Sequence, residues 1–394
     1  MTSTAKSPQT ADDPLAILAI VLVSVFAYAG FLGIPIFVGM MVDQLDFSDG
    51  QAGYVSSAEQ FGILIAAVSV AVLVNRQNRR TLVAVALVVC AVAALASLSV
   101  TEFVPMLVAR FLGGVGEGAV YATAVAILAG SNNSARNFTY IIVAIAASNV
   151  AIFWFFPIVG AQYGIAATYG VLAILSIVGL AFVRWLPAYF ETGKRAVAHN
   201  DTRFPPSLAF VCLAAVVCFY FMCGGSWTYI ERIGVNLGNT PEWVGRYLGY
   251  GVLFSLLGCV IAYWASRRFG QSRPLIVSLL AVTVCLFLFA QNMTTLSWFL
   301  STAAVYLFWN AIDIYQLGTL ANLDSSGRYC ALTPASQGIG MTLGPATAAY
   351  YLDQGASYAI VPYLGAAACL VALMLYLYVH FRIKAIDPSM AARG

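Results

Sequence analysis

The chain has 394 residues, of which 61% are hydrophobic and only 9% are charged, and its formal net charge is +3. A soluble globular domain carries about 25% charged residues, so this composition excludes a soluble protein. The mean hydropathy of +0.86 equally excludes a disordered chain. The few basic residues are spread over short loops, which argues against nucleic-acid binding. The composition predicts an integral membrane protein with several spans.

Runs of about 20 apolar residues, the length that crosses the hydrocarbon layer of a bilayer, occur twelve times along the chain. The first run follows a polar segment without a cleavage site for a signal peptide, so we expect this run to be retained. A charged connection at about 188–206 separates the sixth run from the seventh. The predicted spans are about 15–42, 52–74, 81–100, 103–130, 137–160, 164–187, 207–231, 242–266, 274–291, 295–320, 329–352 and 358–382.

Lysine and arginine residues are distributed unevenly between the two sides of the predicted membrane. Sixteen of the 19 fall on the side that holds both termini and the central connection, two fall on the other side, and Arg110 lies inside a span. Loops rich in lysine and arginine face the cytoplasm. We therefore expect both termini to be cytoplasmic, and we expect the protein in the inner (plasma) membrane of a bacterium.

The two halves of the sequence repeat each other weakly. The fifth span contains Ala-Ser-Asn at 147–149, and the eleventh contains Ala-Ser-Gln 188 residues later, at 335–337. Parallel repeats of this kind, with a binding site near the middle of the membrane, are typical of one large class of secondary transporters. We predict an all-α membrane protein of twelve transmembrane helices in two pseudo-symmetric halves. The six-helix halves are residues 1–187 and 207–394, joined by a cytoplasmic loop at 188–206.

The loop between the second and third spans resembles the signature loop of the major facilitator superfamily. That signature reads Gly-x-x-x-Asp-Arg-x-Gly-Arg-Arg, and residues 71–80 read Ala-Val-Leu-Val-Asn-Arg-Gln-Asn-Arg-Arg. Asn75 stands where the family has an aspartate. In the family this aspartate is implied to take part in a charge relay that holds the outward-facing state. A similar arginine-rich loop follows the eighth span. The resemblance implies that these loops control conformational change through Asn75, Arg76, Arg79, Arg80, Arg267 and Arg268.

The fourth span resembles a second motif of the same family, an arginine followed by a glycine-rich turn. Residues 110–118 read Arg-Phe-Leu-Gly-Gly-Val-Gly-Glu-Gly, and the family associates this motif with proton-coupled carriers, notably drug/proton antiporters. A third motif, Gly-Pro-x-x-Gly-Gly, marks the antiporters and is matched only in part by Phe-Pro-Ile-Val-Gly-Ala at 156–161. The resemblance covers essentially the whole chain and implies the twelve-helix fold of this superfamily.

A charge inside a span costs a few kcal/mol or more and therefore marks a functional candidate. Four ionisable residues inside predicted spans stand out: Glu59, Arg110, Glu117 and Asp313. Arg110 and Glu117 are seven residues apart, so they share one face of a helix at a separation of about 10.5 Å along its axis. Glu59 lies about as deep in the membrane as Arg110. A Glu59–Arg110 ion pair is therefore plausible, either as a structural tie between spans two and four or as a part of the transport site.

Glu117, close to the middle of the membrane, is the first candidate for a proton-coupling residue. Loss of water disfavours the charged form of a carboxyl group, so we expect Glu117 to bind and release a proton in each cycle. The alternative is a permanently protonated carboxyl group that is hydrogen-bonded between helices. Asp313, which lies 196 residues later, is the second candidate, and Glu59 is the third. For Asp313 the alternative is a structural bond to a helix end.

Further polar and aromatic residues fall on predicted spans. Several lie on spans one, four, seven and ten, and the resemblance implies that these four spans line a cavity. The polar residues would bond to substrate or tie helices together. Aromatic residues mostly anchor spans at the membrane interface, yet as a group these indicate a cavity for an apolar or aromatic substrate. Glu231 and Arg232 are interpreted as a solvated pair, with an exterior gate contact as the alternative. The candidate substrate-binding residues are Arg110, Asn149, Asn310, Gln337, Tyr28, Trp227 and Trp309.

The sequence does not support nucleotide binding or metal chemistry. Residues 114–119 fit the dinucleotide pattern Gly-x-Gly-x-x-Ala, but that pattern requires a preceding strand and here lies within a span. The sequence contains no Walker A, His-Glu-x-x-His or Gly-x-Ser-x-Gly motif, and the spacing of His199 and His380 does not suit a metal site. We expect neither enzymatic activity nor a cofactor or metal.

Together these features predict a secondary active transporter of a small organic molecule, coupled to protons and working by alternating access. Three buried acids against one arginine favour export of an apolar or cationic molecule by proton antiport. The alternative is import of a small organic or aromatic acid by proton symport, with Arg110 holding the carboxylate. A third hypothesis is a receptor that binds ligand without flux. The expected partners are substrate, protons and the lipid bilayer, with no nucleic acid, and a monomer is expected.

Overall fold

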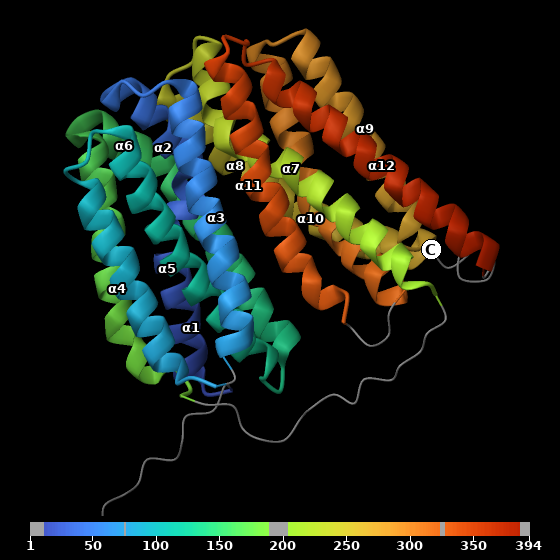
Figure 1. Ribbon diagram of the computed structural model, residues 1–394, viewed down its shortest axis with the longest axis horizontal. Helices are drawn as coiled ribbons and strands as arrows, with labels where there is room; N and C mark the ends of the chain where they lie inside the picture. The colour runs from blue at the N-terminus through green and yellow to red at the C-terminus, as the bar shows by residue number, and fades with distance from the viewer. Residues whose placement is uncertain (1–11, 75, 189–203, 324–327, 387–394) are drawn as a thin grey trace, which may run out of the picture. The chain divides into compact units, whose positions relative to one another are not determined.

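The computed structural model describes residues 12–74, 76–188, 204–323 and 328–386. Within these ranges the regular structure is helical throughout, without a strand, which confirms the predicted all-α class. The helices, drawn in Figure 1, are α1 (Pro14–Ala27), α2 (Ala29–Leu45), α3 (Asp49–Leu73), α4 (Arg79–Ser97), α5 (Phe103–Ala129), α6 (Ser134–Phe182), α7 (Pro206–Asn236), α8 (Pro241–Phe269), α9 (Ser272–Gln291), α10 (Thr295–Leu323), α11 (Thr333–Asp353) and α12 (Ile360–Ile386). Short 3-10 turns occupy Val183–Trp185 and Cys330–Leu332.

The predicted spans correspond to these helices with two local differences. α1 and α2 together form the first span, which is interrupted at Tyr28. α6 is 49 residues long and contains the fifth and sixth spans, which meet at Gly164 with φ 80° and ψ 169°. Only glycine adopts this backbone conformation without strain. Nine helical segments of the described chain are long and apolar enough to cross a membrane, and α10 and α11 have lower hydropathy.

The chain divides into two compact units. Unit 1 contains Met1–Gly33, Ala58–Ile152 and Val159–Arg195, and unit 2 contains Ile34–Ser57, Phe153–Ile158 and Ala196–Gly394. Helices α2, α3 and α6 therefore contribute residues to both units. Each unit holds one group of functional candidates, and each is described by itself below.

Small residues bring the helices of unit 1 close together. α4 and α5 lie side by side, as Figure 1 shows, and α1 packs against α5. A Cβ atom added to Gly116 on α5 would lie 2.7 Å from the carbonyl oxygen of Ala86 on α4, and one added to Gly118 would lie 2.7 Å from Cα of Ile63 on α3. Close approach at small residues is the usual basis of helix packing in membranes. The glycine-rich turn thus fixes where the polar residues of α5 lie.

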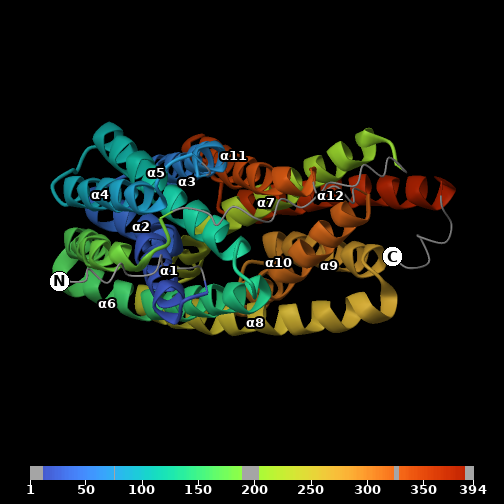
Figure 2. The ribbon, with the colours of Figure 1, turned by 90° about the horizontal axis from the view of Figure 1, so that it is seen from below.

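In unit 2, α7 packs against α11 and α12, and α10 packs against α8 and α9. Figure 2 shows α7 beside α12 and α10 beside α9. A Cβ atom added to Gly224 on α7 would lie 2.8 Å from Cα of Met341 on α11, so the two backbones are nearly in contact. This close packing holds the side chains of α7, α10 and α11 in a fixed arrangement around Asp313.

Candidate functional site

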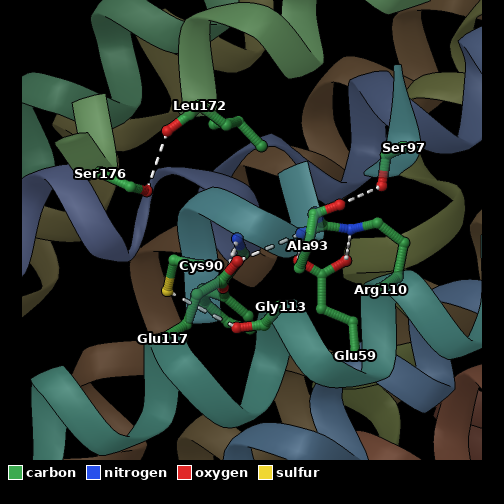
Figure 3. Close-up of polar contacts among 10 residues, drawn as sticks. Glu59, Cys90, Ala93, Ser97, Arg110, Gly113, Glu117, Leu172 and Ser176 are labelled. Atoms are coloured by element: carbon green, nitrogen blue, oxygen red, sulfur yellow. Dashed lines mark hydrogen bonds and ion pairs between the residues drawn. The ribbon is translucent and has the colours of Figure 1, made fainter. Parts of the chain in front are cut away.

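Three of the ionisable residues predicted inside spans meet in unit 1, as Figure 3 shows. Nε of Arg110 donates to Oε2 of Glu59 at 3.1 Å, and Nη2 of Arg110 donates to Oε1 of the same carboxylate, so the expected pair is present and bidentate. The same Nη2 atom lies 3.2 Å from Oε1 of Glu117. All three residues are at most 3% exposed. One buried guanidinium therefore serves two carboxyl groups.

The interruption of the first span supplies another hydrogen-bond donor to Glu117. In an uninterrupted helix the N–H of Phe31 would donate to the carbonyl of Ala27. Here it donates to Oε2 of Glu117 at 3.0 Å. The amino end of a helix carries partial positive charge, so α2 begins with a backbone amide directed at a carboxyl group. Interrupted helices present their amino ends to anions in the same way in other membrane transporters.

Two residues that the sequence did not single out complete this cluster. The Arg110 guanidinium carbon lies 5.5 Å from the ring centre of Tyr169, at a distance typical of cation–π contacts. A Cβ atom added to Gly30 would lie 2.8 Å from Nη2 of Arg110 and 3.0 Å from Oε1 of Glu59. Position 30 therefore needs glycine because the cluster lies directly against the backbone of α2. In the sequence, the contact between α2 and the charged cluster is indicated only by this glycine.

Tyr28 and Asn149, both predicted to bind substrate, also lie in unit 1. The ring of Tyr28 stacks on that of Tyr121 with centroids 4.7 Å apart and an interplanar angle of 18°. Nδ2 of Asn149 lies 3.4 Å from the carbonyl oxygen of Leu32, which is a long hydrogen bond between α6 and α2. In this structure Asn149 thus contacts the helix that supplies a donor to Glu117.

A second polar group, in unit 2, surrounds Asp313 on α10. The hydroxyl of Tyr220 on α7 donates to Oδ2 of Asp313 at 2.5 Å, and Nε2 of Gln337 on α11 lies 3.4 Å from Oδ1. Within the described residues no lysine or arginine forms an ion pair with Asp313. Asp313 and Gln337, predicted independently, thus lie together around a carboxyl group that lacks a cationic partner.

Aromatic side chains surround this second group. The ring of Trp309, one helical turn before Asp313, lies 6.2 Å from that of Tyr220 and 6.0 Å from that of Trp227, in both cases edge to face. Nδ2 of Asn310, which is also predicted to bind substrate, donates to Oγ of Ser255 on α8 at 2.7 Å. A carboxylate among aromatic rings is suited to binding an organic cation.

The two arginine-rich loops make different contacts. In unit 1 the N–H of Arg79 donates to the carbonyl of Ala188 at 3.0 Å, and Nε of Arg80 donates to the carbonyl of Leu186 at 2.5 Å. Arg76 is exposed, and Asn75 lies outside the described residues. The loop after the second span is thus attached to the end of the sixth span.

The equivalent arginines of unit 2 are exposed and contact the aromatic residues of their own helix. Nη1 of Arg267 donates to the hydroxyl of Tyr263 at 2.8 Å. The Arg268 guanidinium carbon lies 5.5 Å from the ring centre of Trp264. Both of these contacts lie within α8.

At the far end of α7, Arg232 connects segments distant in sequence. Its Nη1 lies 2.6 Å from Oδ1 of Asp43 and its Nε lies 3.3 Å from Oδ1 of Asp49. The interpretation of Glu231 and Arg232 as a solvated pair is wrong, because Glu231 is only 2% exposed and its carboxyl group lies against Gly39 of α2. These contacts join the end of α7 to α2 and to the start of α3, and the alternative, an exterior gate contact, stays a prediction.

Within the part of the chain that the structure describes, no three His, Cys, Asp or Glu side chains are grouped closely enough to hold a metal ion. His199 lies outside the described residues. All eight cysteines are free thiols.

The sequence profile described as Major Facilitator Superfamily matches residues 20–327. The chain belongs to this superfamily. No curated protein matches the chain significantly by sequence. Membership identifies an integral membrane protein that acts as a transporter of small molecules rather than as an enzyme, and it confirms the resemblance seen in the loop and in the fourth span.

Solved structures of transporters share the fold. A peptide transporter, POT in complex with sulfate, aligns with a TM-score of 0.77 at 12% identity over 99% of this chain and 98% of that chain. The nucleoside transporter NupG aligns with a TM-score of 0.71 at 13% identity over 94% of this chain and 99% of that chain. The tetrameric PepTSo2 aligns with a TM-score of 0.71 at 14% identity over 95% and 99%. These similarities confirm the predicted fold.

Proposed function

We propose that this superfamily member is a proton-coupled secondary transporter that exports a small apolar or cationic organic molecule by antiport. The observation that carries the proposal is the charge balance of the buried cluster in unit 1. Arg110 carries one positive charge, whereas Glu59 and Glu117 together carry two negative charges when both are ionised. A buried uncompensated charge is strongly disfavoured, so uptake of one proton makes the cluster neutral.

The contacts favour Glu117 as the residue that takes up this proton. Glu59 receives two hydrogen bonds from Arg110, whereas Glu117 receives one from Arg110 at 3.2 Å and one from the N–H of Phe31. Bidentate arginine–carboxylate pairs are the stronger arrangement. The ionised form of Glu59 is therefore better stabilised, and the proton goes to Glu117. Binding and release at Glu117 would then couple the proton gradient to transport.

The surroundings of Asp313 support a cationic or aromatic substrate. This carboxyl group accepts hydrogen bonds from Tyr220 and Gln337 but has no basic partner among the described residues. Tyr220, which donates to this carboxyl group, also contacts the ring of Trp309, and Trp309 in turn contacts Trp227. In this proposal the substrate cation binds at Asp313, whereas the proton that drives its export is taken up and released at Glu117.

A second function, symport of a small organic or aromatic acid, is favoured by one specific contact. The Nη2 atom of Arg110 is shared between Glu59 and Glu117. Protonation of Glu117 would weaken its hold on Arg110 and leave an N–H group for a substrate carboxylate. In that case the same proton would promote binding of an acid instead of release of a cation.

Proton flux in proteoliposomes under an imposed pH gradient tests the proposal. Wild type is compared with Glu117→Gln and with Glu102→Gln, an exposed residue at the start of the same helix. Each is exposed in turn to lipophilic cations, uncharged aromatic compounds and aromatic acids. In wild type and in Glu102→Gln, we expect movement of a cation to drive protons across the membrane in the direction opposite to the cation. In Glu117→Gln we expect no coupled flux.

Each other outcome has a definite meaning. Co-transport of acids with protons would replace antiport by symport. Coupled flux that persists in Glu117→Gln would move the proton site to Asp313 or Glu59. Substrate movement without protons would contradict proton coupling altogether, and binding without any movement would identify a receptor.

A further inference from the structure

Glu231 on α7 is a buried carboxyl group that the proposed function does not use. It is 2% exposed, and its Oε2 atom has no hydrogen-bond partner among the described residues. The carboxyl group lies against α2, where a Cβ atom added to Gly39 would lie 2.8 Å from Cδ of Glu231. An ionised carboxylate that is buried and unpaired is strongly disfavoured, and such a group takes up a proton instead.

The adjacent cation, Arg232, is directed at other groups. Its guanidinium contacts Oδ1 of Asp43 at 2.6 Å, Oδ1 of Asp49 at 3.3 Å and the hydroxyl of Tyr358 at 3.1 Å. One positive charge therefore already faces two carboxylates. Ionised Glu231 would add a further negative charge next to Asp43, whose charge acts on it. Burial and the charge of Asp43 disfavour the ionised form of Glu231, whereas the charge of Arg232 favours it.

The other titratable groups at this end provide no compensating charge. The hydroxyl of Tyr229 on α7 donates to the backbone carbonyl of Asp49 at 3.0 Å. Asp353 at the end of α11 accepts a hydrogen bond from Ser48 at 2.8 Å and adds negative charge. Burial and the hydrogen bond to Asp49 raise the pKa of Tyr358, so its hydroxyl stays neutral. Among the described groups facing Glu231, Arg232 is the only cation.

We propose that Glu231 is a proton-binding site, in addition to Glu117, that is occupied while Gly39 of α2 covers it. Separation of α2 from α7 would expose the carboxyl group to water, where the ionised form is stable, and the proton would leave. Formation of the α2–α7 contact and proton binding are then linked events. The proposal does not rest on the transport function, because it concerns the protonation of one side chain in this conformation.

Infrared spectroscopy of the full-length protein in detergent micelles measures this proton directly, because a protonated carboxyl group has its own carbonyl stretching band. Wild type is compared with Glu231→Gln, which has the shape of the neutral carboxyl group, and with Glu102→Gln, an exposed control. At neutral pH we expect the difference between wild type and Glu231→Gln to contain one neutral-carboxyl band, and the control difference to contain none. Its absence from both differences would overturn the proposal.

The pH dependence of thermal unfolding gives an independent test. A folded state that holds a proton which the unfolded chain has released loses stability as the pH rises. We therefore expect the Tm of wild type to fall relative to that of Glu231→Gln by about 2–4 °C between about pH 6 and pH 9. A constant difference would contradict the proposal. Glu231→Met is a second neutral variant, and failure of both variants to fold would show that the charged form is required.

Discussion

The backbone N–H of Phe31 donates a hydrogen bond to Oε2 of Glu117 at the point where the first span is interrupted. The N–H of Phe31, which would otherwise bond within the helix, thus depends for its hydrogen bond on whether the Glu117 carboxyl group is ionised. Protonation of Glu117 removes the negative charge that attracts this amide. The interruption and the charge of Glu117 are therefore expected to be linked.

Glu117→Ala removes the acceptor, and we expect the amide hydrogens of residues 29–32 to exchange with solvent about tenfold faster, since a lost hydrogen bond of this kind contributes about 1–1.5 kcal/mol. Hydrogen exchange followed by mass spectrometry measures the effect. Thr123→Ala on the same helix is the control, because the Thr123 hydroxyl donates to the carbonyl of Ala119 in its own helix. Unchanged exchange at residues 29–32 would contradict the link.

Gly30→Ala tests the close contact between α2 and the charged cluster. Because the added Cβ atom would lie 2.8 Å from Nη2 of Arg110, we expect a loss of stability of about 1–3 kcal/mol, together with a loss of transport. Thermal unfolding in detergent measures the first effect. Gly170→Ala is the matched control, since its Cβ atom would make an ordinary contact of 3.7 Å with Leu98. Equal stability of the two variants would count against the contact.

Arg110→Gln leaves two buried carboxyl groups without their cation, so we expect it to destabilise the protein by about 3–5 kcal/mol. Addition of Glu59→Gln removes one of the unpaired charges and is expected to restore more than half of the loss. Chemical unfolding of the single and double variants measures both values. A double variant that is no more stable than the single one would show that the ion pair is not the source of the effect.

Asp313→Asn is expected to weaken the binding of a lipophilic cation at least about tenfold, because the amide keeps hydrogen-bonding capacity but loses the charge. Quenching of tryptophan fluorescence measures binding, since Trp309 lies one helical turn before Asp313 and its ring contacts that of Trp227. Asp46→Asn is the control, because Asp46 is exposed and its positive φ of 55° is tolerated by asparagine. Equal affinities for the three proteins would exclude Asp313 from cation binding.

The two arginine-rich loops are expected to respond differently to substitution. Arg80→Ala removes a hydrogen bond to the carbonyl of Leu186, and a bond from a charged donor contributes about 1.5–3 kcal/mol. Arg267→Ala removes only an exposed contact with Tyr263, so its effect should stay within about 0.5 kcal/mol. Thermal unfolding measures the stability of both variants. A larger loss of stability in Arg267→Ala than in Arg80→Ala would contradict this difference between the two loops.

The sequence predicted the spans and the Glu59–Arg110 pair because length, hydropathy and depth in the membrane depend on position along one helix. Contacts that depend on how helices rotate against one another were not predictable in this way. The bond from Tyr220 to Asp313 joins residues 93 positions apart. Glu231 was placed in solvent because its position near a helix end does not reveal that α2 covers it. The Phe31–Glu117 bond requires an interruption at Tyr28 that hydropathy alone does not mark.

The attachment of Arg80 to Leu186 also bears on how the protein is made. These residues are 106 positions apart in the chain, and Arg79 reaches Ala188 in the same segment. During synthesis the loop after the second span enters the membrane surface long before its carbonyl acceptors exist. The first unit can therefore complete these two contacts only after the sixth span has left the ribosome.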